Sequence, residues 1–376
     1  MERIVVGMSG GVDSSVAALL LKRQGYDVVG VFMKNWDEQN DNGECTAAQD
    51  WRDVEEVCGL LDIPCYAVNF EKEYRERVFA QFLAEYKRGR TPNPDVLCNR
   101  EIKFKAFLEF AMKLGAEKMA TGHFVRIGES EGRPLLLRGR DPGKDQSYFL
   151  YMLREAQLHK AHFPVGEVTK AQVREIAREA GLPVSQKKDS TGICFIGERN
   201  FRKFLQGYLP LQGGEMQTPQ GQVVGRHMGL AYYTLGQRRG LGIGGGGDGR
   251  SWFVIGKDLE RNVLLVAQGE NHPALFSRYV RVSQLTWIGD PPAREGEPFR
   301  CTAKFRYRQN DQAVWALLCG KDLFLRSVDF QRAVTPGQSA VLYQGEVCLG
   351  GGIIEEAGRT PMADLDLLIP DAHNCI

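Results

Sequence analysis

The sequence predicts an α/β fold: a doubly wound parallel sheet, followed by a small glycine-rich domain and a C-terminal antiparallel β-barrel. Three observations predict it. Short apolar runs alternate with helix-length segments in the first third of the chain, glycine is concentrated from residue 207 to about 275, and short strands alternate with turns beyond that point. A chain of 376 residues is also too long for one core. We therefore expect three domains, at residues 1–207, 208–275 and 276–376.

The first domain is predicted from the order of its elements. Apolar runs typical of strands occur at Ile4–Met8 and Val28–Met33, a further strand is expected at Cys65–Phe70, and Lys118–His123 continues the alternation. Segments with helical spacing lie between or after them, at Asp13–Gln24, Ala47–Leu61, Glu71–Arg88, Asn99–Leu114 and Thr169–Ala180. Strand, helix and strand in succession imply parallel pairing with right-handed crossovers, and hence a doubly wound sheet.

The last domain shows the spacing of a small barrel or sandwich. Six short strands are predicted, at Tyr279–Leu285, Arg300–Tyr307, Ala313–Leu318, Leu323–Val328, Ser339–Tyr343 and Val347–Ile354. The acidic stretch from Glu355 to Asp371 is expected to lie on the surface.

Composition restricts the class of protein. The chain is 43% apolar and 25% charged, as folded globular proteins are. No stretch reaches the roughly 18 apolar residues of a membrane span, and Met1-Glu2-Arg3 does not begin a signal peptide. We therefore expect a cytoplasmic protein, in which the nine cysteines are mostly reduced. None form a Cys-x-x-Cys pair, so no structural metal site is predicted, and a net charge of +1 means that any attraction for nucleic acid must be local.

A phosphate-binding loop is the sharpest local signal. Ser9-Gly10-Gly11-Val12-Asp13-Ser14-Ser15 lies between the first predicted strand and helix. Its glycines allow backbone N–H groups to surround an anion at a helix N-terminus, and Asp13 could face Mg²⁺. The loop lacks the lysine of the usual nucleotide P-loop. A tight turn with a serine or aspartate cap is the alternative, but the surrounding Ser, Asp and Ser favour pyrophosphate binding.

Two cysteines stand in loops that suit a reactive thiol. Cys98 follows Thr91-Pro92-Asn93-Pro94-Asp95, and the helical pattern begins at Asn99, so Cys98 is expected near a helix N-terminus beside Arg100 and Lys103. Asp95 is a candidate general acid or base. Cys194 lies between glycines after Lys187 and Lys188, a basic setting. A lone cysteine is more often a small buried residue, and we expect that of the following: Cys45, Cys58, Cys65, Cys301, Cys319 and Cys348.

Several blocks together resemble a known family. They are the Ser9 loop, Gly89 to Lys105, Ala120-Thr121-Gly122-His123-Phe124, Gly139 to Tyr148, Lys188 to Glu198, and Thr234-Leu235-Gly236-Gln237-Arg238-Arg239-Gly240. In this order they look like the tRNA-specific 2-thiouridylases, and the likeness runs from residue 3 to about 354. The loop itself resembles that of the ATP pyrophosphatases, which adenylate an acceptor oxygen and release pyrophosphate.

The resemblance implies a reaction. ATP would adenylate the C2 oxygen of the wobble uridine in tRNA, and sulfur would then replace that oxygen, with AMP leaving. It implies that Cys194 carries a persulfide, received from a sulfur-relay donor protein downstream of a cysteine desulfurase, and that Cys98 is its partner thiol. Whether the persulfide attacks directly or Cys98 releases hydrosulfide stays open. Asp95 matches the residue proposed to act on the base as general acid or base.

The resemblance also assigns binding residues. ATP, expected with Mg²⁺, would contact the loop and two residues outside it: Gly7, Met8, Ser9, Gly10, Gly11, Val12, Asp13, Ser14, Met33 and Gly122. The flipped uridine would lie against Asn93, Pro94 and Asp95. Further tRNA contacts would be made by His123, Lys144, Asp145, Gln146, Arg306, Tyr307 and Gln338.

From the residues alone, Lys304, Arg306 and Arg308 share one face of a predicted strand and could grip phosphates. An ordinary solvated face is the alternative. Three other functions remain to be weighed: an adenylating ligase that acts on a small molecule, a tRNA-binding protein without catalysis, and an enzyme that places sulfur on another base or atom.

Overall fold

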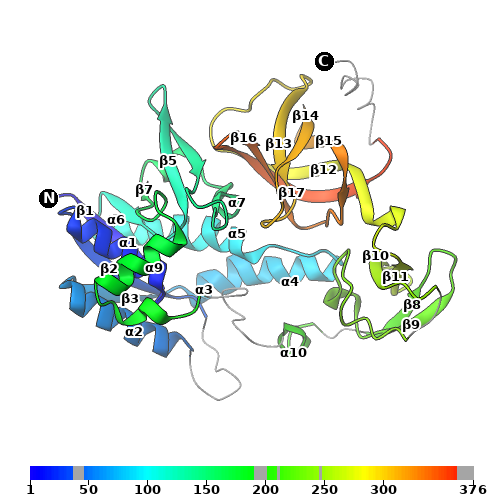
Figure 1. Ribbon diagram of the computed structural model, residues 1–376, viewed down its shortest axis with the longest axis horizontal. Coiled ribbons are helices and arrows are strands. Elements are labelled where there is room, and N and C mark those ends of the chain that lie inside the picture. Colours follow the sequence, from blue (N-terminus) through cyan, green and yellow to red (C-terminus); the bar gives the residue numbers. More distant parts are fainter. Residues whose placement is uncertain (37–45, 190–200, 210–211, 245–247, 362–376) are drawn as a thin grey trace.

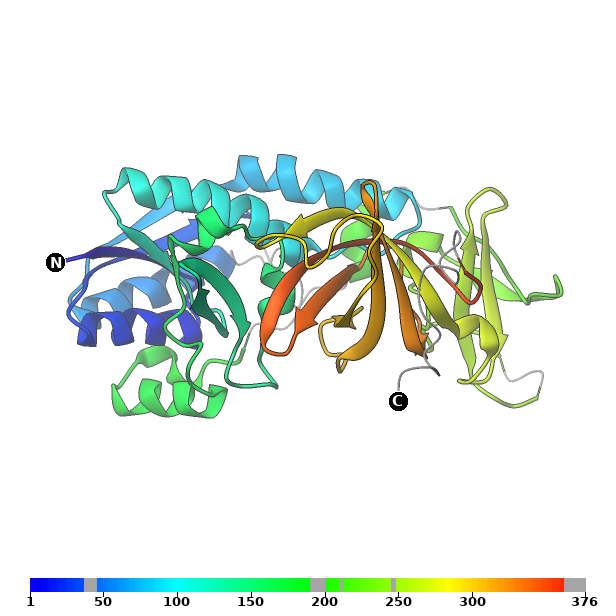
Figure 2. The same ribbon diagram turned by 90° about the horizontal axis from the view of Figure 1, so that it is seen from above.

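The computed structural model describes residues 1–36, 46–189, 201–209, 212–244 and 248–361. It contains a parallel sheet with helices on both faces, a small sheet and a β-barrel (Figures 1 and 2). A run of helix that ends in α4 (Ala80–Lys87) extends from the parallel sheet toward the small sheet and passes beneath the barrel in Figure 1. The predicted fold class is confirmed, and the three parts meet near the end of this helix.

The parallel sheet contains the four predicted strands and a short fifth strand that was not predicted. Its strands are β1 (Arg3–Met8), β2 (Asp27–Lys34), β3 (Cys65–Asn69), β4 (Lys118–Ala120) and β7 (Ala161–His162). They lie in the order β3-β2-β1-β4-β7, and every neighbouring pair is parallel. The chain moves outward from β1 to β2 and β3 and then returns to the other side of β1. A switch point therefore lies between β1 and β4, where open α/β sheets bind ligands.

Two separate cores hold the helices on the faces of this sheet. Ile4, Val6 and Met8 of β1 pack with α1 (Val12–Arg23), α2 (Thr46–Leu61), α9 (Lys170–Glu179) and the 3-10 turn η3 (Pro183–Gln186). Val5 points to the opposite core, because alternate strand residues face opposite sides. That core holds the remaining helices of the first domain: α3 (Glu71–Tyr74), η1 (Arg75–Phe79), α4, α5 (Pro94–Cys98), η2 (Asn99–Phe107), α6 (Leu108–Lys113), α7 (Ser147–Leu150) and α8 (Glu155–Leu158).

The small sheet occupies the predicted glycine-rich region. Its strands are β8 (Gly214–Gln217), β9 (Val223–His227), β10 (Trp252–Asp258) and β11 (Val263–Gln268), in the order β10-β11-β8-β9. Helix α10 (Phe201–Gln206) precedes it, and the 3-10 turns η4 (Leu230–Tyr232) and η5 (Pro273–Leu275) follow β9 and β11.

All six barrel strands are confirmed. They are β12 (Phe276–Trp287), β13 (Phe299–Lys304), β14 (Gln312–Cys319), β15 (Asp322–Arg332), β16 (Ser339–Gln344) and β17 (Val347–Gly358). Antiparallel pairing of β12 with β17 closes the ring. Glu355 and Glu356 belong to β17, where Glu355 is half-buried and Glu356 is exposed, while residues 362–376 lie outside the described part.

Two further differences have local causes. The strand predicted over Arg300–Tyr307 ends at Lys304, so Arg306 and Arg308 stand in a turn rather than on one strand face. There the backbone N–H of Phe305 donates to Oε1 of Gln309 at 3.0 Å, and a turn bond of 3.1 Å links the N–H of Gln309 to the carbonyl of Arg306. These bonds occupy backbone groups that would pair with a neighbouring strand if β13 continued further.

A hairpin that the sequence analysis did not predict links the first domain to the barrel. It consists of β5 (Val125–Ser130) and β6 (Arg133–Arg138), and β6 pairs with β17 at Leu137 and Val347. The first domain therefore contributes two strands to the sheet that forms the barrel. No helix in the described part of the chain is both long enough and apolar enough to cross a membrane.

Candidate active site

The phosphate loop lies at the carboxyl end of β1, as predicted. The backbone N–H of Ser9 donates to Oγ of Ser14 at 3.2 Å, and the two serine hydroxyls are 3.1 Å apart. The hydroxyls of Ser14 and Ser15 donate to the carbonyl of Gly11 at 3.2 and 2.9 Å. The loop is thus closed by its own side chains.

Gly10 is required for this shape. Its φ of +70° lies in the left-handed region, and a Cβ there would approach the carbonyl oxygen of Asp50 to 2.7 Å. Gly11, in extended conformation, precedes the first turn of α1, whose unpaired N–H groups and positive dipole end favour an anion.

The other residues assigned to ATP converge on this loop. A Cβ on Gly7 would lie 3.1 Å from Cε of Met33, so the Met33 side chain of β2 lies against Gly7 near the end of β1. A Cβ on Gly122 would lie 2.6 Å from the backbone C of Asp13 and 2.6 Å from the backbone N of Ser14. The chain after β4 therefore touches the loop directly at the switch point, and residues far apart in sequence form one site.

A cluster of charges adjoins the loop. Nζ of Lys170 lies 2.5 Å from Oδ1 of Asp13 and 2.8 Å from Oδ1 of Asp189. Asp189 also accepts hydrogen bonds of 2.7 Å from Nζ of Lys144 and 2.7 Å from Nη2 of Arg174. Burial opposes ionisation of Asp189, but the hydrogen bonds and charges of Lys144 and Lys170 outweigh it and lower its pKa to about 2. At Asp13, burial dominates and raises the pKa, although Lys170 opposes it.

Lys187 also contacts the phosphate loop. Its Nζ donates to the carbonyl of Gly10 at 2.9 Å, to Oδ1 of Asp50 at 2.8 Å, and to the carboxylate of Asp53. Two carboxylates of α2 therefore pair with Lys187, and the predicted basic setting of Cys194 stays a prediction. Cys194 itself lies outside the described residues, as does Cys45.

Cys98 is the last residue of α5 and is 1% exposed. The expectation that the helix begins after Cys98 was wrong. It begins at Pro94, which suits the first helical position, and Oδ1 of Asn93 caps it by accepting the N–H of Val96 at 3.4 Å. Asp95 stands in the first turn, one turn before Cys98, and the π-helical segment η2 follows. Such segments are frequent at functional sites.

The loop before α5 is held by all three parts of the molecule. The backbone N–H of Thr91 donates to the carbonyl of Pro336 at 3.0 Å, and Nε2 of Gln338 donates to the carbonyl of Thr91 at 2.8 Å. From the small sheet, Nζ of Lys257 donates to the carbonyl of Gly89 at 2.8 Å. Arg90, on the same loop, pairs with Glu355 of β17. The Asn93–Asp95 segment therefore follows a loop that is fixed where the first domain, the small sheet and the barrel meet.

The residues assigned to tRNA lie in different settings. Arg306 is exposed, and the ring of Tyr307 packs 4.4 Å from that of Phe149 (centroid distance). Asp145 is 4% exposed and accepts the N–H groups of Gly139 and Ser147, each at 3.1 Å. Oε1 of Gln146 accepts the N–H of Phe124 at 3.0 Å. Asp145 and Gln146 thus shape the turn that presents Lys144, and their contact with tRNA stays a prediction.

His123 follows β4 and is 9% exposed. Its Nδ1 lies 2.7 Å from Oγ1 of Thr121, and its ring packs between Phe104 and Phe163. Burial, helped by the charge of Lys103, lowers the pKa of His123 well below its usual value, so the ring is neutral at physiological pH.

Sequence reasoning missed Lys170, Arg174 and Asp189 as site residues. Lys170 is the first residue of α9 and gives no local signal. Asp189 lay within a motif that was quoted only for its cysteine. Of the cysteines expected to be buried, Cys58 and Cys348 are buried, whereas Cys65, Cys301 and Cys319 are half-buried. Burial raises the pKa of Cys301 and Cys348 to about 12, so both are poor nucleophiles.

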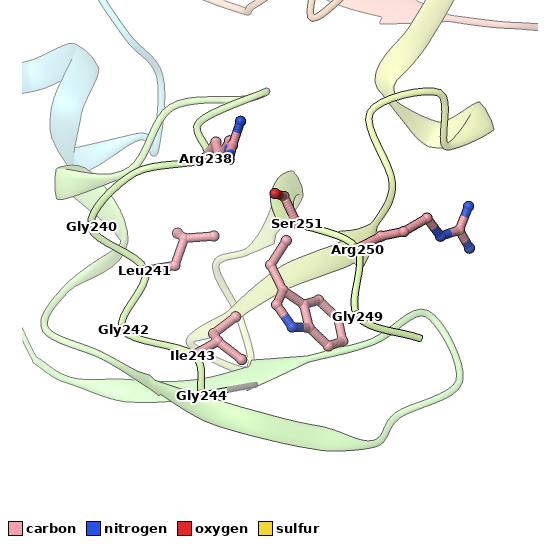
Figure 3. A pocket seen from close by; sticks show the side chains of 10 residues that line it. Arg238, Gly240, Leu241, Gly242, Ile243, Gly244, Gly249, Arg250 and Ser251 are labelled. Atoms are coloured by element: carbon pink, nitrogen blue, oxygen red, sulfur yellow. The ribbon is translucent and has the colours of Figure 1, made fainter. Parts of the chain in front are cut away.

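A separate hollow of about 280 Å³ lies in the glycine-rich domain (Figure 3). Leu241, Ile243 and Trp252 line one part of it, and Arg250 points away from its centre in this view. It contains none of the residues assigned to ATP or to sulfur transfer, and no group of three or more potential metal ligands occurs among the described residues.

Comparison with known families defines the class of protein. The tRNA methyl transferase HUP domain family matches residues 2–198, the tRNA methyl transferase PRC-barrel domain family matches residues 202–268, and the Aminomethyltransferase beta-barrel domain family matches residues 277–354. The first match alone spans more than half of the chain. The chain is thus a three-part protein of the tRNA methyl transferase HUP type.

Curated relatives give the particular family. The chain is 59% identical to "tRNA-specific 2-thiouridylase MnmA" of Bacillus licheniformis, over 94% of this chain and 95% of the relative. It is 59% identical to the protein of that name from Bacillus subtilis, over 94% and 95%. It is 60% identical to that of Burkholderia multivorans, over 95% and 94%. The chain belongs to the tRNA-specific 2-thiouridylase family.

Proposed function

We propose that this protein uses ATP to adenylate the C2 oxygen of the wobble uridine in tRNA and then replaces that oxygen with sulfur, releasing AMP and pyrophosphate. The observation that carries the proposal is the contact of Gly122 with the backbone of the closed Ser9–Ser14 loop at the switch point of the sheet, with Met33 against Gly7 just before the loop. A loop of this kind at a helix N-terminus suits pyrophosphate as a leaving group.

Adenylation is chemically necessary for this exchange. The C2 oxygen of uridine is a poor leaving group, whereas the same oxygen within AMP departs readily. In the proposal, Asn93, Pro94 and Asp95 contact the extruded base, and Asp95 acts on that base as general acid or base. The fixation of this loop by Gln338 and Arg90 supports it, since a base must be held in place during attack.

Sulfur delivery is assigned to Cys194 and Cys98. A sulfur-relay donor protein would form the Cys194 persulfide, and after transfer the two cysteines would join as a disulfide that a thiol must reduce. Such a cycle suits the reducing cytoplasm, which we propose as the compartment. Support comes from the position of Asp189, five residues before Cys194, beside the phosphate loop.

ATP fits the loop, and Mg²⁺ is proposed to accompany it. Mg²⁺ is usually held by one or two carboxylates together with substrate phosphates. Asp13, the carboxylate of the loop itself, would hold the ion, and it faces Lys170 in the described structure. A metal ion would therefore share Asp13 with this lysine and neutralise phosphate charge, while the loop orients the phosphates.

The direct test is mass spectrometry of nucleosides from unmodified tRNA incubated with the protein, ATP and a sulfur donor. We expect 2-thiouridine at the wobble position and one AMP per thiouridine. A methylated uridine would favour the activity in the name of the matching domain family, and exchange of pyrophosphate into ATP that requires a metabolite but not tRNA would favour a small-molecule ligase. Sulfur found in another base would support the proposed chemistry but show that the target is a different base.

Replacement of Arg306 tests the tRNA surface. Arg306→Ala is expected to weaken tRNA binding several-fold and to reduce the slope of log affinity against log salt by about 1, because one phosphate contact is lost. Fluorescence titration of labelled tRNA at several salt concentrations measures both. Arg23→Ala, at the far end of α1 from the phosphate loop, is the control. An unchanged slope in Arg306→Ala would mean that Arg306 does not contact phosphate.

A further inference from the structure

Asp189 is unusual among the carboxylates of the described chain because three cations share it. Oδ1 accepts from Lys170 at 2.8 Å and from Arg174 at 2.7 Å, and Oδ2 accepts from Lys144 at 2.7 Å. Its side chain is 29% exposed, whereas that of Lys170 is 11% exposed. Exposed single ion pairs contribute little to stability. A carboxylate that pairs with three cations, one of them the buried ammonium group of Lys170, is instead held in a fixed position.

The three cations come from two elements, helix α9 and the Lys144 turn. Lys170 begins α9 and also pairs with Asp13 of the phosphate loop. Lys144 stands in the turn assigned to tRNA. Arg174 lies one turn further along α9, and its Nη1 also donates to the carbonyls of Ser185 and Lys187 at 3.2 and 3.1 Å. Through these cations, Asp189 is linked to the phosphate loop, to the Lys144 turn assigned to tRNA, and to the chain segment just before Asp189 itself.

The chain just before Asp189 is anchored as well. Lys187 donates to the carbonyl of Gly10 in the phosphate loop, at 2.9 Å. Cys194 is the fifth residue after Asp189, and an extended chain spans at most about 3.5 Å per residue. The Cα atom of Cys194 therefore lies within roughly 18 Å of that of Asp189, whatever path the chain takes. The position of Asp189 sets the region that Cys194 can reach.

We propose that Asp189 is a positioning residue for sulfur transfer: through Lys170 and Lys144 it ties the start of the segment that carries Cys194 to both substrate sites. This inference rests on the proposed function. It assigns Asp189 no contact with substrate, and it makes adenylation independent of Asp189, since Lys170 keeps its 2.5 Å contact with Asp13 and the loop is closed by its own serines.

The test compares the two steps in Asp189→Asn. The first step is measured as tRNA-dependent exchange of pyrophosphate into ATP, and the whole reaction as 2-thiouridine formed. We expect exchange within about threefold of the parent protein and thiouridine formation reduced at least tenfold. Asp189→Glu, which retains the charge, should recover part of the loss. Asp290→Asn, which removes an exposed ion pair with Arg133, is the matched control.

A second variant and a second sulfur source keep the test independent of folding defects. Arg174→Met should shift the ratio of thiouridine to exchange in the same direction, by a smaller factor. Inorganic sulfide, which needs no Cys194, should narrow the difference between Asp189→Asn and the parent. Equal losses of exchange and thiouridine, no loss in either, or an unchanged difference with sulfide would each overturn the inference. Absence of thiouridine from the parent protein would instead overturn the proposed function.

Discussion

Gly122→Ala is expected to reduce tRNA-dependent exchange of pyrophosphate into ATP by about 100-fold, since a displacement of about 1 Å in a reacting group has an effect of this order. The reason is steric. The new Cβ would lie 2.6 Å from the backbone of both Asp13 and Ser14, and backbone atoms cannot rotate away as a flexible side chain can. The loop must then move at the residues that contact phosphate.

The matched control is Gly59→Ala, in α2. No atom lies within 4 Å of a Cβ at Gly59, and the residue is exposed within a helix, so alanine there should be neutral or stabilise the protein by up to about 1 kcal/mol. Thermal unfolding of both variants separates a local effect on the loop from a loss of folding. Exchange in Gly122→Ala within threefold of the parent would show that the loop does not bind the phosphates of ATP.

The parallel sheet was predictable because its signals are local. Val28–Met33 is an apolar run, and both Val28–Met33 and Lys118–His123 lie between helical segments, so the alternation of strand and helix placed them. The same local rule failed at Arg306, because the side chain of Gln309 ends the strand, and at Pro94, because a proline that interrupts one helix suits the start of another.

The candidate site was predictable only where a motif marks it. The Ser9–Ser14 loop and the sequence around Cys98 carry such marks. Lys170 and Asp189 do not, because their role depends on tertiary contacts between α9, the Lys144 turn and the loop. The hairpin β5–β6 was missed for a similar reason: it completes a sheet whose other strands lie more than 100 residues later.

Cys98→Ser and Cys194→Ser are both expected to reduce multiple-turnover formation of 2-thiouridine by about 1,000-fold or more, with tRNA affinity unchanged, because each removes a thiol that no other group replaces. Cys319→Ser, on β14 of the barrel, is the control. A normal yield of thiouridine in either cysteine variant would remove that residue from the mechanism.

The species that accumulates distinguishes the two routes. If the terminal sulfur of the Cys194 persulfide attacks C2 directly, AMP leaves and a disulfide joins Cys194 to the thiolated base. Cys98 would then attack the sulfur of Cys194, releasing 2-thiouridine and forming the Cys98–Cys194 disulfide. Cys98→Ser would therefore trap a covalent protein–tRNA adduct that dithiothreitol converts to free 2-thiouridine. If Cys98 first releases hydrosulfide, no adduct forms, and added sulfide restores thiouridine in both variants. Either route requires Cys194 to approach buried Cys98, within the reach from Asp189 that the chain allows.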